Sequence, residues 1–149
     1  MRAIGGYNKT PAVAALAGRH FELAQILCRK GSSVNILGHD GNSPLHSAVN
    51  HTDFELVQAL VDCGADVNRR NEYGFILFLL SQIGEIGKTS LHLALILGRI
   101  DIARILVEHG ASVKVKDESG KSPLDYALEE QRREIIKLYR AKREICCIM

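Results

Sequence analysis

The stretch Ser43-Pro44-Leu45-His46-Ser47-Ala48 returns 46 residues later as Thr89-Ser90-Leu91-His92-Leu93-Ala94. Weaker copies of this motif begin at Thr10-Pro11, 33 residues before the first of these, and at Ser122-Pro123, 33 residues after the second. Glycines follow the same interval, at Gly31, Gly64 and Gly110 and again at Gly41, Gly74 and Gly120. A motif that recurs about every 33 residues predicts an architecture of stacked structural repeats.

Each repeat is expected to form two short helices. Thr or Ser is a good helix N-cap, and Pro suits the first helical position because its missing N–H costs nothing there. We expect first helices at residues 44–50, 90–97 and 123–130, and second helices that begin near Asp53, Asp101 and Arg133. Gly64 and Gly110 follow second helices, where a left-handed residue is favoured. Small residues recur in the first helices, at Ala15, Ala48, Ala94 and Ala127, as close packing between stacked units requires.

With these motifs the chain resembles an ankyrin-repeat protein. The motifs at 43–48 and 89–94, together with Leu60-Val61-Asp62-Cys63-Gly64-Ala65-Asp66-Val67-Asn68 and residues 105–111, carry the resemblance, which covers residues 9–143. It weakens at both ends, where Ala12-Val13 replaces the family's Leu-His and Asp125 replaces its His. The resemblance implies an all-α solenoid of stacked helix-turn-helix units with β-hairpin-like connecting loops. It also implies that His46 and His92 tie neighbouring hairpins together.

The chain is predicted to form a single domain over residues 1–149. Its repeats are expected at 9–41, 42–74, 88–120 and 121–143, with an insertion at 75–87 and a C-terminal tail at 144–149. Little sequence precedes Thr10, so we expect a thin N-terminal cap, which is compatible with a truncated gene product.

The amino-acid composition limits the kinds of partner that the chain is expected to bind. The 149 residues carry a formal net charge of +2, which gives no general attraction to nucleic acid or anionic membranes. The N-terminus lacks the apolar run of a signal peptide, and the apolar run at 75–80 is too short to cross a bilayer. Four cysteines without a C-x-x-C pair favour a reducing cytoplasmic or nuclear location. Basic residues of the last helix are interpreted as a solvated capping face: Arg132, Arg133, Lys137, Arg140, Lys142 and Arg143.

One segment resembles a phosphate-binding P-loop; its sequence is Gly84-Glu85-Ile86-Gly87-Lys88-Thr89-Ser90. However, Gln82 stands where that motif needs glycine, and Lys88-Thr89 already opens the third repeat. A nucleotide-binding protein is therefore kept only as a minor alternative. We expect no enzyme, no catalytic residue, no cofactor and no metal.

The remaining histidines and one asparagine are weaker candidate sites. His39, His51 and His109 are expected to face solvent, and none has a second ligand at zinc-binding spacing. Asn68 resembles asparagines that the family can have hydroxylated, and its alternative role is to hold the turn.

The insertion at 75–87 is unusual because it is almost uncharged, although surface loops are seldom so apolar. Its deletion restores the repeat spacing. Two interpretations stay open: a hydrophobic finger that binds a partner, or an accidental insertion such as a retained intron, which is slightly favoured.

The chain ends in Cys146-Cys147-Ile148-Met149, which fits the prenylation motif. Cys146 would carry the lipid, and the basic helix before it could supply the second signal for membrane attachment. The alternative is a chance sequence at the end of the chain.

We expect a non-catalytic, monomeric adaptor that binds a protein partner through its hairpin tips and the concave face of its first helices. The candidate contact residues are His39, Asp40, Asn42, Asn50, His51, Arg70, Glu72, Tyr73, Lys88, Ile96, Leu97, Lys116, Glu118, Lys121, Glu129 and Glu130. Tyr73 and Arg70 are expected to contribute most to affinity because of their residue types. A prenylated membrane adaptor is the alternative.

Overall fold

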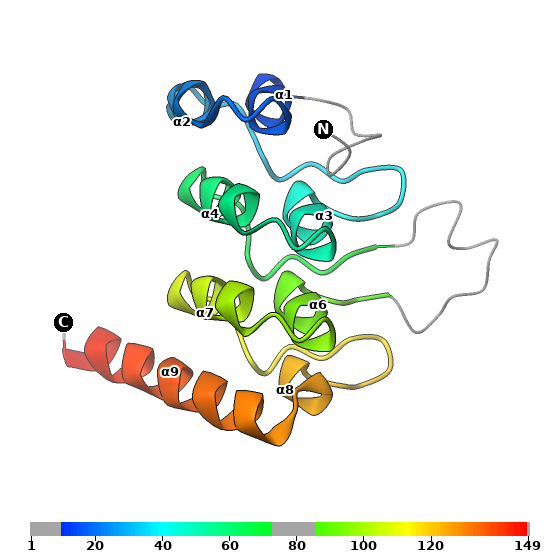
Figure 1. Cartoon of the computed structure of the whole chain (residues 1–149), viewed down its shortest axis with the longest axis vertical. Coiled ribbons are helices and arrows are strands. Elements are labelled where there is room, and N and C mark those ends of the chain that lie inside the picture. Colours follow the sequence, from blue (N-terminus) through cyan, green and yellow to red (C-terminus); the bar gives the residue numbers. More distant parts are fainter. Residues whose placement is uncertain (1–9, 73–85, 149) are drawn as a thin grey trace.

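The computed structural model describes residues 10–72 and 86–148, and within them the chain is helical, with no β-strand. The helices are α1 (Pro11–Ala17), α2 (Phe21–Arg29), α3 (Pro44–Asn50), α4 (Phe54–Asp62), α6 (Ser90–Ile96), α7 (Ile100–Glu108), α8 (Pro123–Tyr126) and α9 (Glu129–Ile148). They form four antiparallel pairs stacked one on the next, with the first helices in one row and the second helices in another (Figure 1). The predicted all-α repeat stack is confirmed.

The first helices begin where the motif predicts. The hydroxyls of Thr10, Ser43 and Thr89 accept hydrogen bonds from the backbone N–H three residues on, at 3.3–3.4 Å. After the second helices, Gly64 and Gly110 have φ of +84° and +96°, a conformation that L side chains rarely adopt. The short helices of each unit therefore have defined ends. The bounds of α3 and α6, and the starts of α4 and α7, lie within one residue of the prediction.

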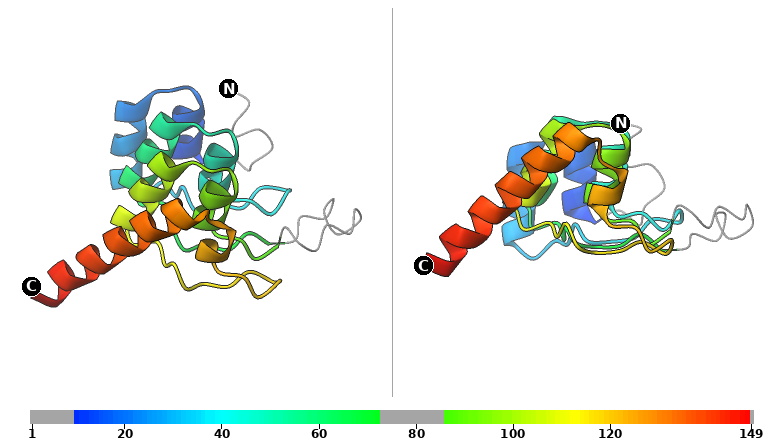
Figure 2. Two further views of the ribbon diagram at one scale, coloured as in Figure 1. Left: turned by 60° about the horizontal axis from the view of Figure 1, so that its bottom comes forward. Right: turned by 90° about the horizontal axis from the view of Figure 1, so that it is seen from below.

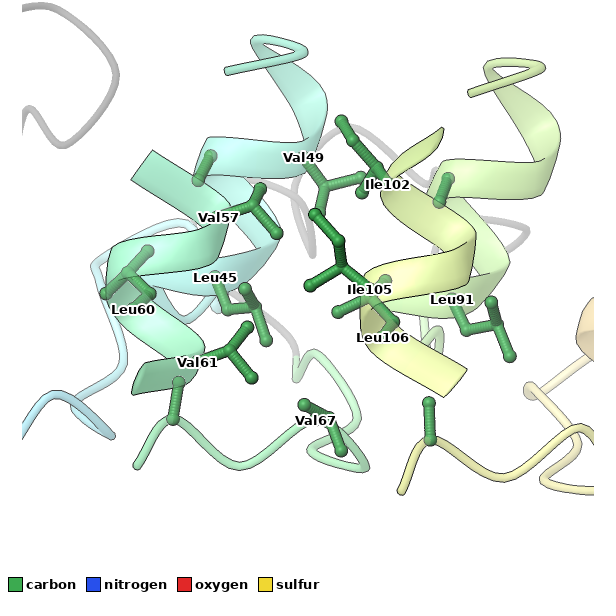
Figure 3. Close-up of a cluster of buried hydrophobic side chains, with 14 of the residues drawn as sticks. Leu45, Val49, Val57, Leu60, Val61, Val67, Leu91, Ile102, Ile105 and Leu106 are labelled. Carbon is green, nitrogen blue, oxygen red and sulfur yellow. The ribbon is translucent and has the colours of Figure 1, made fainter. Parts of the chain in front are cut away.

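The core is continuous along the stack. Leu45, Val49, Val57 and Val61 of one unit lie toward Ile102, Ile105 and Leu106 of the next, and Leu60 and Leu91 belong to the same buried cluster (Figure 3). The four repeated alanines are at most 8% exposed, as predicted. Burying one such aliphatic side chain stabilises a fold by about 2 kcal/mol, so the contacts between neighbouring units contribute substantially to stability.

The last unit differs from the prediction. α8 ends at Tyr126, Ala127 is extended, and α9 begins at Glu129 rather than near Arg133. In the other units the turn between helices uses a residue with positive φ: Arg19, Thr52 or Gly98. Gln131 holds that position here, and its side chain instead accepts a hydrogen bond from Leu128 N–H, capping α9. The long helix then lies across the end of the stack (Figure 2).

Candidate protein-interaction surface

The loops between units project from one side of the stack, beside the first helices (Figure 2). Each loop closes at its base with the same hydrogen bond, from the backbone N–H of Gly38, Asn71 or Asp117 to the carbonyl of Asn42, Lys88 or Lys121, at 2.8–2.9 Å. Gly41, Gly87 and Gly120, which precede these carbonyl residues, share a φ of 74–77°. The three hairpins thus have one geometry at their bases.

In the sequence, the insertion falls between the two residues that close the second hairpin, Asn71 and Lys88. The closing pair is four residues apart in the first and third hairpins but 17 apart in the second, which accounts for the 13 extra residues. Gly87, which the sequence assigned to the insertion, occupies the turn position, and a Cβ there would lie 2.5 Å from Arg70 Nη2. Ile86 is only 4% exposed. Residues 73–85 lie outside the described residues, so both interpretations of the insertion stay predictions.

Two histidines join successive hairpins, as the resemblance implied. His46 Nδ1 accepts from Ser43 N–H at 3.2 Å, so Nε2 carries the proton and donates to the Lys88 carbonyl at 2.9 Å. His92 repeats this arrangement between Thr89 N–H and the Lys121 carbonyl. Burial lowers the pKa of His46 to about 4 and also lowers the pKa of His92. Both rings are therefore neutral connectors inside the stack.

Asn68 joins the second unit to the third. Its side-chain amide donates to the Gly110 carbonyl at 3.0 Å, and its oxygen accepts from Ser112 N–H at 2.7 Å. Asn35 makes the same pair of bonds one unit earlier, with Gly64 and Asp66. The structure therefore gives Asn68 the turn-holding role, while its hydroxylation stays a prediction.

Lys88 is a correction to the sequence analysis, which expected an exposed contact residue. Its side chain is 2% exposed, with Nζ 3.5 Å from Asp117 Oδ2 and 5.4 Å from the centre of the Tyr126 ring. Tyr126 also donates a hydrogen bond to Asp117. Burial alone would raise the pKa of Asp117, but the bonds from Tyr126 and the Lys121 N–H, with the Lys88 charge, hold that pKa below its ordinary value. Lys88 therefore connects units inside the protein.

The sequence did contain a signal for this pairing. Asn42 and Asn71 are 29 residues apart and their side chains hydrogen-bond at 3.3 Å, and Lys88 and Asp117 are also 29 apart. In each case the residue before an N-cap pairs with the hairpin of the following unit. A polar pair repeated at this distance could have identified Lys88 as buried.

Arg70 and Glu118 form an ion pair of 2.8 Å between the second and third hairpins, and Arg70 Nε also donates to the Gly87 carbonyl at 3.1 Å. They line an open depression of about 690 Å³ on the hairpin side, together with Asn68 and Glu72. The expected contact of Arg70 with a partner is thus compatible with its position, although its guanidinium is already engaged. Tyr73 lies outside the described residues.

The other predicted contact residues divide into two groups. Exposed residues of the hairpins are His39, Asp40, Glu72, Lys116, Glu118 and Lys121, and Asn42 is half-buried. Asn50, His51, Ile96 and Leu97 are exposed where α3 and α6 end, and Glu129 and Glu130 are exposed at the start of α9. In the structure the hairpin residues lie close together. The helix-end residues lie along the row of first helices.

Cys28 and Cys63 lie at the junction of the first two units, partly buried against the core. Burial, followed by a hydrogen bond with Cys28, raises the pKa of Cys63 to about 12. A thiol with so high a pKa is a poor nucleophile. Cys28 and Cys63 therefore serve as packing residues at this junction.

The described part of the chain lacks a metal-binding cluster and a membrane-spanning helix. Residues 10–72 and 86–148 contain no group of three His, Cys, Asp or Glu side chains that could hold a metal ion. None of the helices described is both long and apolar enough to cross a membrane. Cys146 lies in the last turn of α9, and its prenylation stays a prediction.

Comparisons with known proteins agree with this architecture. The sequence model described as ankyrin repeats (three copies) matches residues 2–71 and 72–145, and the chain belongs to the ankyrin-repeat family. It is 31% identical over 114 residues to the SMC5-SMC6 complex localization factor protein 1 of Bos taurus, covering 75% of this chain and 10% of that protein. Ankyrin repeats generally mediate protein–protein interactions.

Two further relatives are of quite different kinds. The chain is 32% identical over 117 residues to the E3 ubiquitin-protein ligase Ufd4 of Drosophila melanogaster, covering 76% of this chain and 4% of the ligase. It is 30% identical over 96 residues to the potassium channel AKT1 of Oryza sativa subsp. indica, covering 64% of this chain and 9% of the channel. The chain spans a tenth or less of these relatives.

Proposed function

We propose that the chain is a non-catalytic module that binds a protein partner through its row of hairpin tips. One observation carries this proposal: the buried polar groups hold the hairpins to one another, while the tips expose charged side chains on one side of the stack. The buried His46 and His92 make these connections, and the exposed Asn68 adds a further bond between the second and third units. A row positioned in this way can bind a partner with little loss of conformational freedom, which favours affinity.

The composition of the row fits a polar rim around a small apolar centre. Glu72, Lys116 and Glu118 supply exposed charges of both signs, and Ile96 and Leu97 supply apolar surface, 43% and 44% exposed, on the neighbouring first helix. Interfaces that form and dissociate commonly have this arrangement. The partner is therefore expected to be a protein surface of mixed charge.

Affinity capture from a cell extract, quantified by mass spectrometry, tests the proposal. The test variant removes two tip charges, Glu72→Ala with Lys116→Ala, and keeps the net charge unchanged. The matched control, Glu22→Ala with Lys137→Ala, removes one charge of each sign from exposed positions of α2 and α9. We expect the tip variant to lose specific partners by about tenfold or more while the control retains them. Loss with the control alone would assign binding to the helical surfaces instead.

A further inference from the structure

A groove runs between the second helices α2 and α4, in the row of the stack that lies away from the hairpins (Figure 1). It is an open depression of about 390 Å³. Its lining includes two aromatic rings, two amides and two carboxylates, from Phe21 and Gln25 of α2 and Phe54, Glu55, Gln58 and Asp62 of α4. None of the lining residues is Lys or Arg. The groove thus combines apolar surface with negative charge.

This side of the second helices stays accessible along the stack. Phe54 belongs to the second unit, which has a helix pair packed on either side of it, and its side chain is still 44% exposed. Gln25, Gln58 and Arg104 occupy one repeat position, and each of them is exposed or half-buried. Stacking of one unit on the next therefore does not cover the groove.

The chain's own Arg19 shows which chemistry suits these side chains. Its guanidinium lies over the Phe21 ring, with Cζ 6.0 Å from the ring centre. It also pairs with Glu55 at 3.4 Å and with Asp53 at 2.6 Å. A guanidinium is attracted both to the face of an aromatic ring and to a carboxylate. Phe54 and the exposed side of Glu55 offer the same two groups to a second arginine.

Asp62 places a further carboxylate at the other end of the groove. It accepts a hydrogen bond from Gln58 at 2.9 Å and is exposed. The neighbouring basic side chains lie outside the groove: His109 Nε2 is 4.0 Å from Asp62 on the α7 side, and Arg29 lines the adjoining depression. Because an α-helix rises by about 1.5 Å per residue, the two ends of the groove are about 12 Å apart. An extended chain covers that distance in about four residues.

In the next groove, between α4 and α7, cations accompany the carboxylates. Asp101 occupies the repeat position of Glu55, and Arg99 pairs with it at 2.6 Å. Arg104 adds a positive charge where α4 has a glutamine, and it pairs with Glu134 of α9. The groove between α2 and α4 therefore has the more negative lining.

We propose that the groove between α2 and α4 binds an extended, arginine-containing segment of a partner protein. One guanidinium lies against Phe54 and Glu55, and a second, about four residues away in the segment, lies beside Asp62. Charge complementarity and the contacts of Arg19 favour arginine, because its planar guanidinium can stack on a ring and pair with a carboxylate at once. The hairpin tips lie on another side of the stack, so this inference does not depend on the proposed function.

NMR titration of the intact, ¹⁵N-labelled chain tests the proposal. The probe is a synthetic alanine-leucine peptide with two arginines four residues apart, and the matched peptide has citrulline, the neutral analogue, in place of each arginine. We expect the arginine peptide to shift amide signals of α2 and α4, and the citrulline peptide to bind about tenfold more weakly or worse.

Two protein variants locate the site. Glu55→Gln with Asp62→Asn should weaken binding of the arginine peptide by about fivefold or more, since exposed charge pairs each contribute modestly. The control, Asp101→Asn with Glu108→Gln, makes the same charge change at the same repeat positions of α7 and should bind normally. The NMR spectrum shows whether each variant is folded. The proposal is overturned if millimolar arginine peptide leaves α2 and α4 unshifted, if citrulline binds equally well, or if the Glu55/Asp62 variant binds as tightly as the control.

Discussion

His46 fits its buried site only while its imidazole is neutral. Nδ1 must accept a hydrogen bond from Ser43 N–H, and a protonated ring would bring a second N–H to that position. Burial accounts for the lowered pKa, because the protonated form would lose its hydration in the core. His92 has the same contacts and a pKa shifted in the same direction. These two residues therefore couple the stability of the stack to pH.

We predict that stability falls as pH decreases from 6.5 to about 4. The folded-state pKa of His46 is lowered from 6.5 to about 4, so the unfolded chain takes up the proton first and is stabilised relative to the folded state. At about 1.4 kcal/mol for each pH unit, the effect of His46 approaches about 3.5 kcal/mol and levels off below the folded-state pKa. Urea unfolding at a series of pH values measures it. His46→Gln should flatten the dependence, whereas His39→Gln, at an exposed tip, should not.

Lys88 gives a second prediction at a single position. Lys88→Ala should destabilise the protein by about 3–5 kcal/mol, because it leaves the buried carboxylate of Asp117 without its cation. Lys121→Ala, at the equivalent exposed position of the next unit, should cost less than about 1 kcal/mol. Chemical denaturation compares the two, and Lys88→Met with Asp117→Asn should recover part of the loss. Equal small effects for both lysines would show that the buried pair contributes nothing.

The helices follow the sequence wherever a local signal determines them. Thr10, Ser43 and Thr89 begin helices as predicted, and Gly64 and Gly110 follow helices as predicted, because caps and left-handed residues act within one turn of chain. The start of α9 was predicted four residues late, because the repeat register was extended to a unit that lacks the turn residue. The burial of Lys88 was also missed, because its partner Asp117 lies in the following hairpin, beyond any local pattern.

We predict that the second hairpin tolerates removal of the insertion. Asn71 and Lys88 already close its base with the hydrogen bond found in the other hairpins, so deleting residues 75–87 leaves a loop of ordinary length. The shorter loop should raise stability by about 1 kcal/mol through a smaller entropy of closure. A variant that lacks residues 73–85 instead keeps Ile86 and Gly87, and it should show the same gain in stability. Thermal unfolding monitored by circular dichroism measures both, and a deletion that abolishes folding would contradict the prediction.

Different parts of the molecule have different structural roles. The second helices and the core hold the stack, the hairpins extend from the side of the first helices, and the two ends differ in polarity (Figure 2). Partner binding through the tips would therefore leave the second helices and the core unchanged. The family's broad range of relatives fits this design, since tip residues can change without any change in the core.

Hydrogen–deuterium exchange of the chain with and without its captured partner tests the proposed binding surface most directly. We predict that binding slows exchange at hairpin residues 38–42, 69–72, 86–88 and 116–121, and along the ends of α3 and α6. Exchange in α4 and α7 should be unchanged, because these second helices lie on the other side of the stack. Protection confined to the second helices or α9, with the hairpins unaffected, would contradict the account.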